Sequence, residues 1–166
     1  ISSRISKKRI IRSINLLNLT AMRDLGISNP KIAVLGLNPH AGENGLIGNE
    51  EEMIIKPAIK SLQKKINVTG PFVPDAFWGN KTYKKFDMIL GMYHDQILIP
   101  FKLLNFNSGV NFTAGLGLIR TSPDHGTAYD IAGMNKANEW SLLQSYKYAI
   151  KIFQNRKRFI AETKSH

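Results

Sequence analysis

Two histidines, each placed just after an apolar run, are the side chains in this sequence best suited to chemistry. His94 follows the run at residues 86–91 and is itself followed by Asp95, and His40 follows the run at residues 31–36. Neutral imidazole binds divalent metals readily, and a neighbouring carboxylate can orient the ring. The pattern therefore indicates a shared metal site or an acid–base pair, with a lone surface histidine as the alternative at each position.

Two histidines are too few to close a metal site on their own. Carboxylates such as Glu43, Asp75 and Asp95 could add oxygen ligands or orient the imidazole rings. Even with these groups, we expect the metal site to need further ligands that this pattern does not contain.

Three polar residues downstream of His94 could bind an anionic molecule. Lys102, Asn111 and Arg120 lie on segments that we expect to be extended, and together they offer an ammonium, an amide and a guanidinium group. Such a set suits a carboxylate and a phosphate, which arginine binds in a bidentate manner. The alternative is three unrelated positions on half-exposed strands, although Asn111 stands in an apolar run where a buried amide would need a partner.

The stretch at residues 124–133 combines small residues, a hydroxyl group and a histidine. His125, Gly126, Thr127 and Asp130 could wrap closely around a planar ligand, or the stretch could simply be a glycine-rich turn before the last helix. No Gly-x-Gly-x-x-Gly fingerprint occurs, so a dinucleotide-binding Rossmann domain is not supported.

The elements that must position these residues follow from apolar periodicity and from turn residues. The segments expected to be helical are 10–25, 49–65 (with a capping box at Asn49 to Glu52) and the segment carrying Trp140, Leu143, Tyr146, Ile150 and Phe153. The segments expected to be strands or extended are 31–37, 72–75, 86–91, 101–104 and 110–119. The segments expected to be irregular are the loop 38–48, the break 68–71 and the polar loop 120–126.

Strands that alternate with helices indicate an α/β domain with a mostly parallel sheet. Ligands of such sheets bind beyond the carboxyl ends of the strands. If the strands before His40 and His94 are parallel, both imidazoles face the same crevice.

Composition sets outer limits on the protein class. The chain has 166 residues, 43% of them hydrophobic, and no cysteine, which predicts one folded domain without disulfides or thiolate metal sites. No apolar stretch has the length of a membrane helix, so we expect a soluble, cytoplasmic protein without membrane contact. The net charge of +11 is interpreted as solvated helix faces. The alternatives are a surface that attracts a phosphorylated metabolite and a surface that binds nucleic acid.

Four motifs in the same order resemble the 4-hydroxythreonine-4-phosphate dehydrogenase family of pyridoxal phosphate biosynthesis. They are residues 37–43, 92–96, 109–111 and 119–128. Residues 124–133 also resemble a loop of isocitrate and isopropylmalate dehydrogenases that touches the cofactor adenosine. The resemblance implies the three-layer α/β/α sandwich of those dehydrogenases.

The resemblance also implies a reaction and the roles of individual residues. The reaction is oxidation of 4-phosphooxy-L-threonine at its secondary alcohol by NAD, with NADP as the alternative, followed by decarboxylation to 3-amino-2-oxopropyl phosphate. His40 and His94 match two of three histidines that hold a divalent metal (zinc, magnesium, manganese or cobalt) shared across a homodimer. The other matching positions are the substrate-binding Lys102, Asn111 and Arg120, the catalytic candidates Lys102 and Asp75, and the cofactor loop with His125, Gly126, Thr127 and Asp130.

One departure from the family limits these expectations. Family members are about twice as long and carry a third metal histidine in their N-terminal half, so residues 1–166 resemble the C-terminal half alone. We expect such a chain to have reduced activity or none. The alternatives are a dehydrogenase of another phosphorylated four-carbon hydroxy acid, such as threonate or erythronate phosphate, and a non-catalytic dimerisation or anion-binding module.

Overall fold

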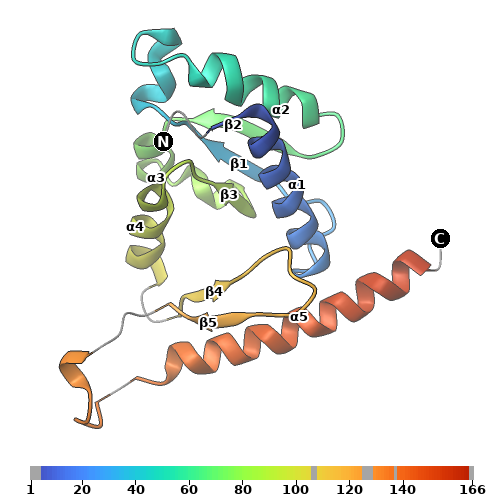
Figure 1. Cartoon of the computed structure of the whole chain (residues 1–166), viewed down its shortest axis with the longest axis vertical. Helices are drawn as coiled ribbons and strands as arrows, with labels where there is room; N and C mark the ends of the chain where they lie inside the picture. Colours follow the sequence, from blue (N-terminus) through green and yellow to red (C-terminus); the bar gives the residue numbers. More distant parts are fainter. Residues whose placement is uncertain (1–4, 106–107, 125–128, 137, 165–166) are drawn as a thin grey trace.

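The computed structural model describes residues 5–105, 108–124, 129–136 and 138–164 (Figure 1). The helices are α1 (Lys7–Arg23), α2 (Lys56–Leu62), α3 (Pro74–Gly79), α4 (His94–Asn105) and α5 (Trp140–Lys164). The strands are β1 (Ile32–Leu35), β2 (Val68–Phe72), β3 (Met88–Leu90), β4 (Val110–Phe112) and β5 (Thr121–Pro123). Shorter helical turns are η2 (Pro39–Gly45), η3 (Glu51–Ile55), η4 (Thr82–Lys85) and η5 (Tyr129–Ile131).

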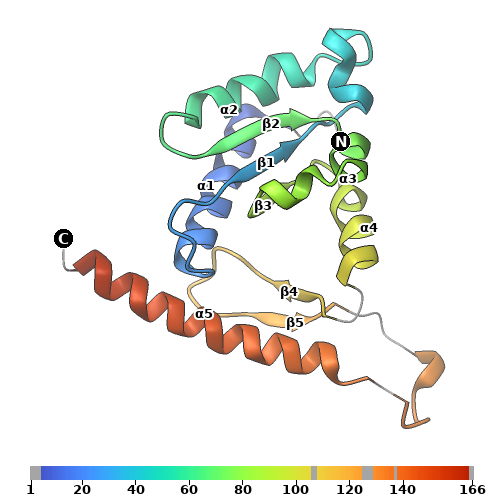
Figure 2. The same ribbon diagram turned by 180° about the vertical axis from the view of Figure 1, so that it is seen from behind.

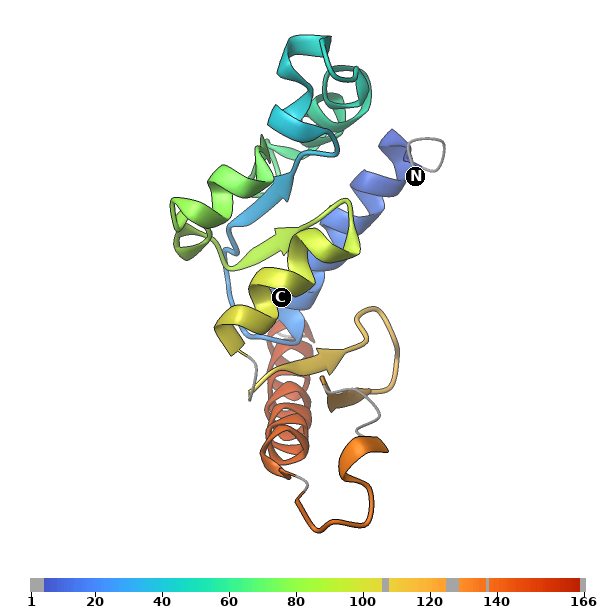
Figure 3. The same ribbon diagram turned by 90° about the vertical axis from the view of Figure 1, so that its left-hand side faces the viewer.

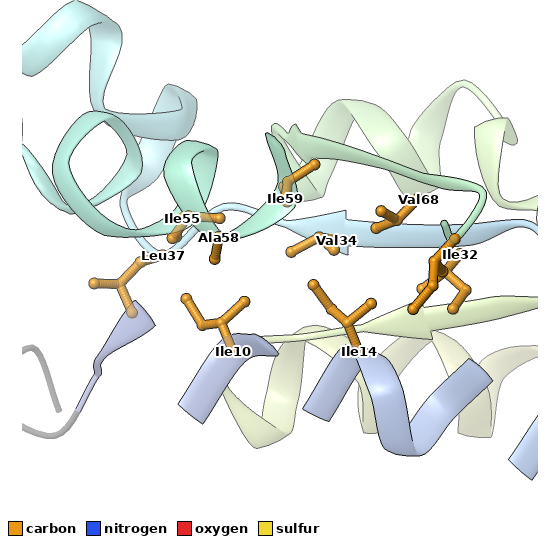
Figure 4. Close-up of a cluster of buried hydrophobic side chains, with 10 residues drawn as sticks. Ile10, Ile14, Ile32, Val34, Leu37, Ile55, Ala58, Ile59 and Val68 are labelled. Carbon is orange, nitrogen blue, oxygen red and sulfur yellow. The ribbon is translucent and has the colours of Figure 1, made fainter. Parts of the chain in front are cut away.

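One part of the molecule is built on a three-stranded parallel sheet in the order β2-β1-β3. Successive side chains of a strand point to opposite faces, so the fully buried β1 contributes to two cores. Ile32 and Val34 pack with α1 and α2, as Figure 4 shows. Ala33 and Leu35 pack with Phe77 of α3 on the other face. The expected α/β class is confirmed, with helices on both faces of this sheet.

The remaining strands form a separate unit. β4 and β5 pair in an antiparallel ribbon that packs along α5, away from the three-stranded sheet (Figures 2 and 3). The Thr121 hydroxyl donates to the Ser145 carbonyl over 3.0 Å, which fixes the ribbon on the helix. The three-layer sandwich and the likeness to isocitrate and isopropylmalate dehydrogenases stay predictions, and this ribbon lies outside the parallel sheet.

A buried carboxylate joins α5 to the end of α1. Asp24 is fully buried, and its carboxylate accepts hydrogen bonds from Arg23 (2.8 Å) and Arg156 (2.7 Å). The side chain of Asn155 donates to the Asp24 carbonyl over 2.8 Å. Burial alone would raise the pKa of Asp24, but the hydrogen bonds from the two guanidinium groups outweigh it and hold this pKa below its ordinary value.

One strand lies where the sequence predicted a break. Residues 68–71 belong to β2, which is an edge strand, and a proline is tolerated there because one side of the strand needs no partner. A Cβ on Gly70 would lie 2.3 Å from the Val34 carbonyl oxygen, so this glycine allows the close approach of β2 to β1. Residues 72–75 are also not extended throughout, since Pro74 begins α3.

Two further predictions downstream of His94 were wrong. Residues 101–104 were expected as a strand but lie in α4, because a short apolar run cannot be distinguished from a helix segment by periodicity alone. The expected extended segment 110–119 is a strand only at β4, and β5 lies within the expected polar loop. The chain reverses between them, with Gly115 in the left-handed region at φ +84°.

The helix predictions fared better. α2 falls within the expected segment 49–65, α1 begins three residues before the expected segment 10–25, and α5 begins at Trp140 as expected and continues to Lys164. Within the described residues, no helix is both long enough and apolar enough to cross a membrane.

Candidate functional site

His94 is the first residue of α4, directly beyond the carboxyl end of β3. Its side chain is 74% exposed, and its Nδ1 lies 2.9 Å from Oδ1 of Asp95. A hydrogen bond from Nδ1–H to this carboxylate leaves Nε2 of the neutral ring with its lone pair. The pair therefore has the arrangement in which a carboxylate orients a histidine for metal binding or proton transfer.

His40 lies in the turn η2, beyond the carboxyl end of β1. β1 and β3 are neighbours and run parallel, so the connections that carry His40 and His94 leave the sheet at the same edge. The backbone from His40 to Asn44 is left-handed throughout, with φ between 44° and 82°. Such a run is rare for residues other than glycine, so neighbouring groups must hold it in place.

Glu51 is the group that holds this turn. Its carboxylate is fully buried, and Oε1 accepts hydrogen bonds from the backbone N–H of Leu37 (2.7 Å) and of Asn38 (2.8 Å). Its Oε2 accepts from the side chain of Asn38 over 2.9 Å. A Cβ on Gly42 would lie 2.8 Å from Oε2, which shows how closely the turn wraps the carboxylate.

The sequence predicted a different use for these acidic residues. Residues 49–52 were expected to form a capping box, but η3 begins without a side-chain cap, and Glu51 points inward instead. Glu50 also contacts the turn: Asn38 donates to its carboxylate over 2.8 Å and lowers the pKa of Glu50. The sequence held one signal of this burial: three consecutive acidic residues directly precede apolar residues of the same helical segment, so one acid can lie on its buried side.

A cavity of about 360 Å³ adjoins His94 on the α1 side of the sheet. Its wall is mostly apolar, with polar groups from the beginning of α1. The lining residues are Ile5, Arg9, Ile10, Ser13, Leu37, Leu90, Gly91, Met92, Tyr93 and His94. The residues that precede and include His94 thus line a hollow large enough for a small molecule.

Lys102, Asn111 and Arg120 do not lie on three successive strands as predicted. Lys102 is on α4, eight residues and therefore about 12 Å along the helix from His94. Asn111 is on β4, where its side chain is exposed rather than buried, so the expected need for a partner does not arise. Arg120 immediately precedes β5 and donates to the Thr113 hydroxyl over 3.0 Å.

The ribbon nevertheless places these residues on one side. Asn111 pairs with Ser122, and Thr113 bonds to Arg120 across the ribbon, so Asn111 and Arg120 share the face that points away from α5. The ammonium group of Lys102 lies 3.6 Å from the carboxylate of Asp124, just past β5. This ion pair brings Lys102 of α4 to the end of the same ribbon.

Asp75 and Asp130 lie in short helical segments outside the ribbon. Asp75 is exposed in the first turn of α3, and α3 contacts the turn η2 that carries His40. Asp130 lies in η5. His125, Gly126 and Thr127 lie outside the described residues, so the cofactor contacts stay a prediction.

The donor set can be tested against a divalent metal. His94 has the right chemistry, because Asp95 holds one ring nitrogen and the other remains available. Within the described residues, no group of three or more His, Cys, Asp or Glu side chains is close enough to hold a metal ion. His94 thus has the chemistry of one metal ligand, and a shared metal site with His40 stays a prediction.

Comparisons with known proteins agree on one family. Residues 1–149 match the family model for the pyridoxal phosphate biosynthetic protein PdxA. The 4-hydroxythreonine-4-phosphate dehydrogenase of Sulfurihydrogenibium is 51% identical over 95% of this chain and 48% of its own length. That of Bacteroides thetaiotaomicron is 50% identical over 95% of this chain and 44% of its own length. The chain thus spans about half the length of the curated relatives it matches.

Solved structures give the same result. The chain superimposes on 4-hydroxythreonine-4-phosphate dehydrogenase from Klebsiella pneumoniae with a TM-score of 0.76 at 45% identity, covering 90% of this chain and 46% of that one. A terephthalate 1,2-cis-dihydrodiol dehydrogenase from Burkholderia xenovorans is more distant, with a TM-score of 0.69 at 30% identity, over 90% of this chain and 48% of that one. Because the family model matches residues 1–149 of this chain, the chain belongs to the PdxA family of pyridoxal phosphate biosynthetic proteins.

Proposed function

We propose that this chain contributes to the NAD-dependent oxidation of 4-phosphooxy-L-threonine in pyridoxal phosphate biosynthesis. The observation that carries the proposal is the pair of connections that leave the neighbouring strands β1 and β3 at one edge, each with a histidine, one of them oriented by Asp95. The names of the most similar relatives support the same activity. NADP is an alternative acceptor of the hydride.

In this proposal, the substrate alcohol loses hydride from its carbon to the nicotinamide ring and its hydroxyl proton to the site. The resulting β-keto acid then loses carbon dioxide to give 3-amino-2-oxopropyl phosphate. His40 and His94 would hold a divalent ion, with zinc, magnesium, manganese and cobalt as the candidates. Such an ion, when bound, favours loss of the hydroxyl proton and stabilises the negative charge formed during decarboxylation.

The ribbon supplies the groups that would orient the substrate. Asn111 and Arg120 share one face, and a guanidinium group binds a phosphate or carboxylate in a bidentate manner. Lys102 supplies positive charge at the end of the ribbon or assists proton transfer, and Asp75 is the second candidate for proton transfer. Holding the substrate in this way contributes to catalysis by reducing the entropy lost in reaching the transition state.

We also propose that the complete site forms in a cytoplasmic homodimer that shares the metal between subunits. The incomplete donor set among the described residues supports sharing, since His40 and His94 need further ligands. Size-exclusion chromatography with light scattering, with and without cobalt, tests this part. A monomer in both conditions at micromolar concentration would contradict it.

The activity test is the absorbance of NADH formed from NAD, 4-phosphooxy-L-threonine and a divalent metal. We expect His94→Ala and Lys102→Ala to lower turnover by at least tenfold, while Lys84→Ala, an exposed lysine in η4, leaves it unchanged. Normal turnover by His94→Ala would overturn the metal assignment. For a chain without measurable turnover, isothermal titration with cobalt gives the second readout, in which His94→Ala should abolish binding.

A substrate panel distinguishes the proposed activity from the related ones. The structural likeness to a dehydrogenase that is named for a dihydrodiol supports testing other alcohol substrates as well. Threonate phosphate and erythronate phosphate belong in the panel beside 4-phosphooxy-L-threonine. If the enzyme turns over either of these compounds faster, the substrate assignment changes but the reaction class stays the same. Salt-sensitive binding of nucleic acid without turnover would favour a non-catalytic module instead.

A further inference from the structure

Gln96 joins the two connections that carry the histidines. It is half-buried at the third position of α4, two residues after His94. Its Oε1 accepts hydrogen bonds from the backbone N–H of Met92 (2.8 Å) and of Tyr93 (3.2 Å). Its Nε2 donates to the carbonyl of Gly36 over 2.9 Å, sixty positions away in the sequence.

These bonds give the two ends of the amide different tasks. The Oε1 end caps the first turn of α4, in the way that a glutamine at the third helical position often reaches back to the chain before the helix. The Nε2 end forms a tether from α4 to the residue that follows β1. The orientation of the amide is fixed, because its oxygen faces two donors and its nitrogen faces a carbonyl.

Gly36 is a firm anchor for this tether. Its own N–H donates to the Phe72 carbonyl over 2.8 Å and so belongs to the sheet. A Cβ at Gly36 would lie 3.2 Å from the Cα of Ala41 and 3.2 Å from Oε1 of Glu51, so the turn that carries His40 packs directly against it. A displacement of the beginning of α4 would therefore have to stretch a bond to a residue that is bonded to β2 and is followed by Leu37, which Glu51 holds.

We propose that Gln96 is a positioning residue that fixes His94 relative to His40 through its hydrogen bond to Gly36. This inference rests on the proposed function, in which the two histidines bind one metal ion. Groups that orient metal ligands without touching the metal typically change the affinity by about tenfold to a hundredfold. Gln96 acts in this way on two ligands at once, because it holds both connections.

The first test measures the relative position of the two histidine sites without any metal. The sequence has no cysteine, so nitroxide labels attach only at His40→Cys and His94→Cys. Dilution of the labelled chain with an excess of unlabelled chain removes distances between subunits, and electron paramagnetic resonance then reports the distance within one chain. Gln96→Glu keeps an oxygen for the Met92 and Tyr93 amides but places a second oxygen against the Gly36 carbonyl. This variant therefore removes the tether and retains the helix cap.

Gln63→Glu is the matched control. Gln63 also donates from Nε2 to a backbone carbonyl, that of Val68, but at the opposite edge of the sheet. We expect Gln96→Glu to broaden or shift the distance distribution and Gln63→Glu to leave it unchanged. An unchanged distribution in Gln96→Glu, or equal broadening in both variants, would overturn the proposal. Urea unfolding of both variants shows whether either has merely lost its fold.

The second test measures cobalt affinity by titration, with Gln96→Leu so that no new carboxylate can bind the metal. We expect affinity to fall by about tenfold or more, while Gln63→Leu binds as the parent chain does. Unchanged affinity in Gln96→Leu would overturn the role of Gln96 in metal binding. If the parent chain binds no cobalt but Gln96→Glu still broadens the distance distribution, the metal part of the proposed function fails and the positioning role of Gln96 is supported.

Discussion

The two parts of this molecule differ in how far their apolar side chains are buried. Around β1, the large aliphatic residues Ile14, Ile32 and Ile59 are at most 2% exposed. Along α5, by contrast, Tyr146 and Phe153 are 65% and 52% exposed. Figure 1 shows the difference in architecture: helices enclose the sheet of β1, whereas α5 has the ribbon of β4 and β5 on one side.

This difference in burial indicates which candidate site residues are held by a rigid part of the molecule. The turns that carry His40 and His94 leave the part with its own core, and buried polar groups fix them there. The ribbon with Asn111 and Arg120 packs along α5, and polar bonds around Asp24 join α5 to the end of α1. A set of polar bonds thus connects the expected substrate-binding ribbon to the rest of the protein.

The largest effect should come from breaking that connection. Asp24→Ala leaves Arg156 and Arg23 without their buried counter-charge, which typically costs about 3–5 kcal/mol in the free energy of unfolding. Urea unfolding measures the cost, and hydrogen exchange should show α5 losing more protection than β1. Glu162→Gln, an exposed carboxylate on the same helix, is the control. Equal loss of protection in both parts would show that they unfold as one unit.

The same carboxylate predicts a pH dependence. The pKa of Asp24 is lowered in the folded state, so its contribution is present above the pKa of an unfolded aspartate, about 3.9, and is lost as pH falls through the lower folded value. Unfolding curves of the parent chain and of Asp24→Asn should therefore converge in that acid range. Parallel curves throughout would contradict the role assigned to the charge.

Two isoleucines on α5 test the exposure of its faces directly. Ile152 is 1% exposed and Ile150 is 42% exposed, and both can be changed to alanine. We expect Ile152→Ala to cost about 2–4 kcal/mol and Ile150→Ala about 0.5 kcal/mol, because only the first leaves a cavity. Urea unfolding at several protein concentrations is the measurement. A similar cost for both variants would show that the exposed face is covered in solution.

Glu51 tests the rigidity of the part that carries the histidines. Glu51→Gln replaces one carboxylate oxygen by an N–H₂ group and loses part of the bonding to Leu37 and Asn38, at a cost of about 1–3 kcal/mol. The adjacent Glu52→Gln removes only an exposed ion pair with Lys56 and should cost under about 0.5 kcal/mol. Hydrogen exchange of the Leu37 and Asn38 amides locates the effect. Equal costs for both variants would show that burial of Glu51 is unimportant.

The smallest effect on stability should come from the ion pair between Lys102 and Asp124. The two groups are 3.6 Å apart and partly exposed, so Lys102→Ala should change the free energy of unfolding by under about 0.5 kcal/mol. Turnover or ligand binding should nevertheless fall, because the expected role of Lys102 is functional. A loss of stability as large as that of Asp24→Ala would show that α4 is held to the ribbon by this pair.

Much of the architecture could be predicted from local patterns. The apolar periodicity of α1 and the uniformly apolar run of β1 depend only on neighbouring residues, and both elements lie where the sequence placed them. β2 was missed because its glycine and proline are typical of turns, and only the sheet shows why they are tolerated there. The segment at residues 101–104 was ambiguous for a related reason, since a four-residue apolar run suits a strand as well as α4.

α5 shows the limit of periodicity most clearly. The spacing of Trp140, Leu143 and Tyr146 predicted the helix correctly, yet these side chains are exposed, while Ser145, Ile152 and Asn155 are the buried ones. Periodicity determines that one face of a helix is apolar. It does not determine which face meets the rest of the chain, because that depends on distant groups such as Asp24.

The sequence by itself determined the residue types of the candidate site and the strand ends that carry His40 and His94. These properties are local, since a histidine that follows a buried strand must emerge at the edge of the sheet. Only the tertiary structure decided what holds the histidines: the carboxylate of Glu51 inside one turn, and the amide of Gln96 joining α4 to Gly36. The physical reason is that a buried hydrogen-bonding group needs a partner in space, and its position in the chain does not specify that partner.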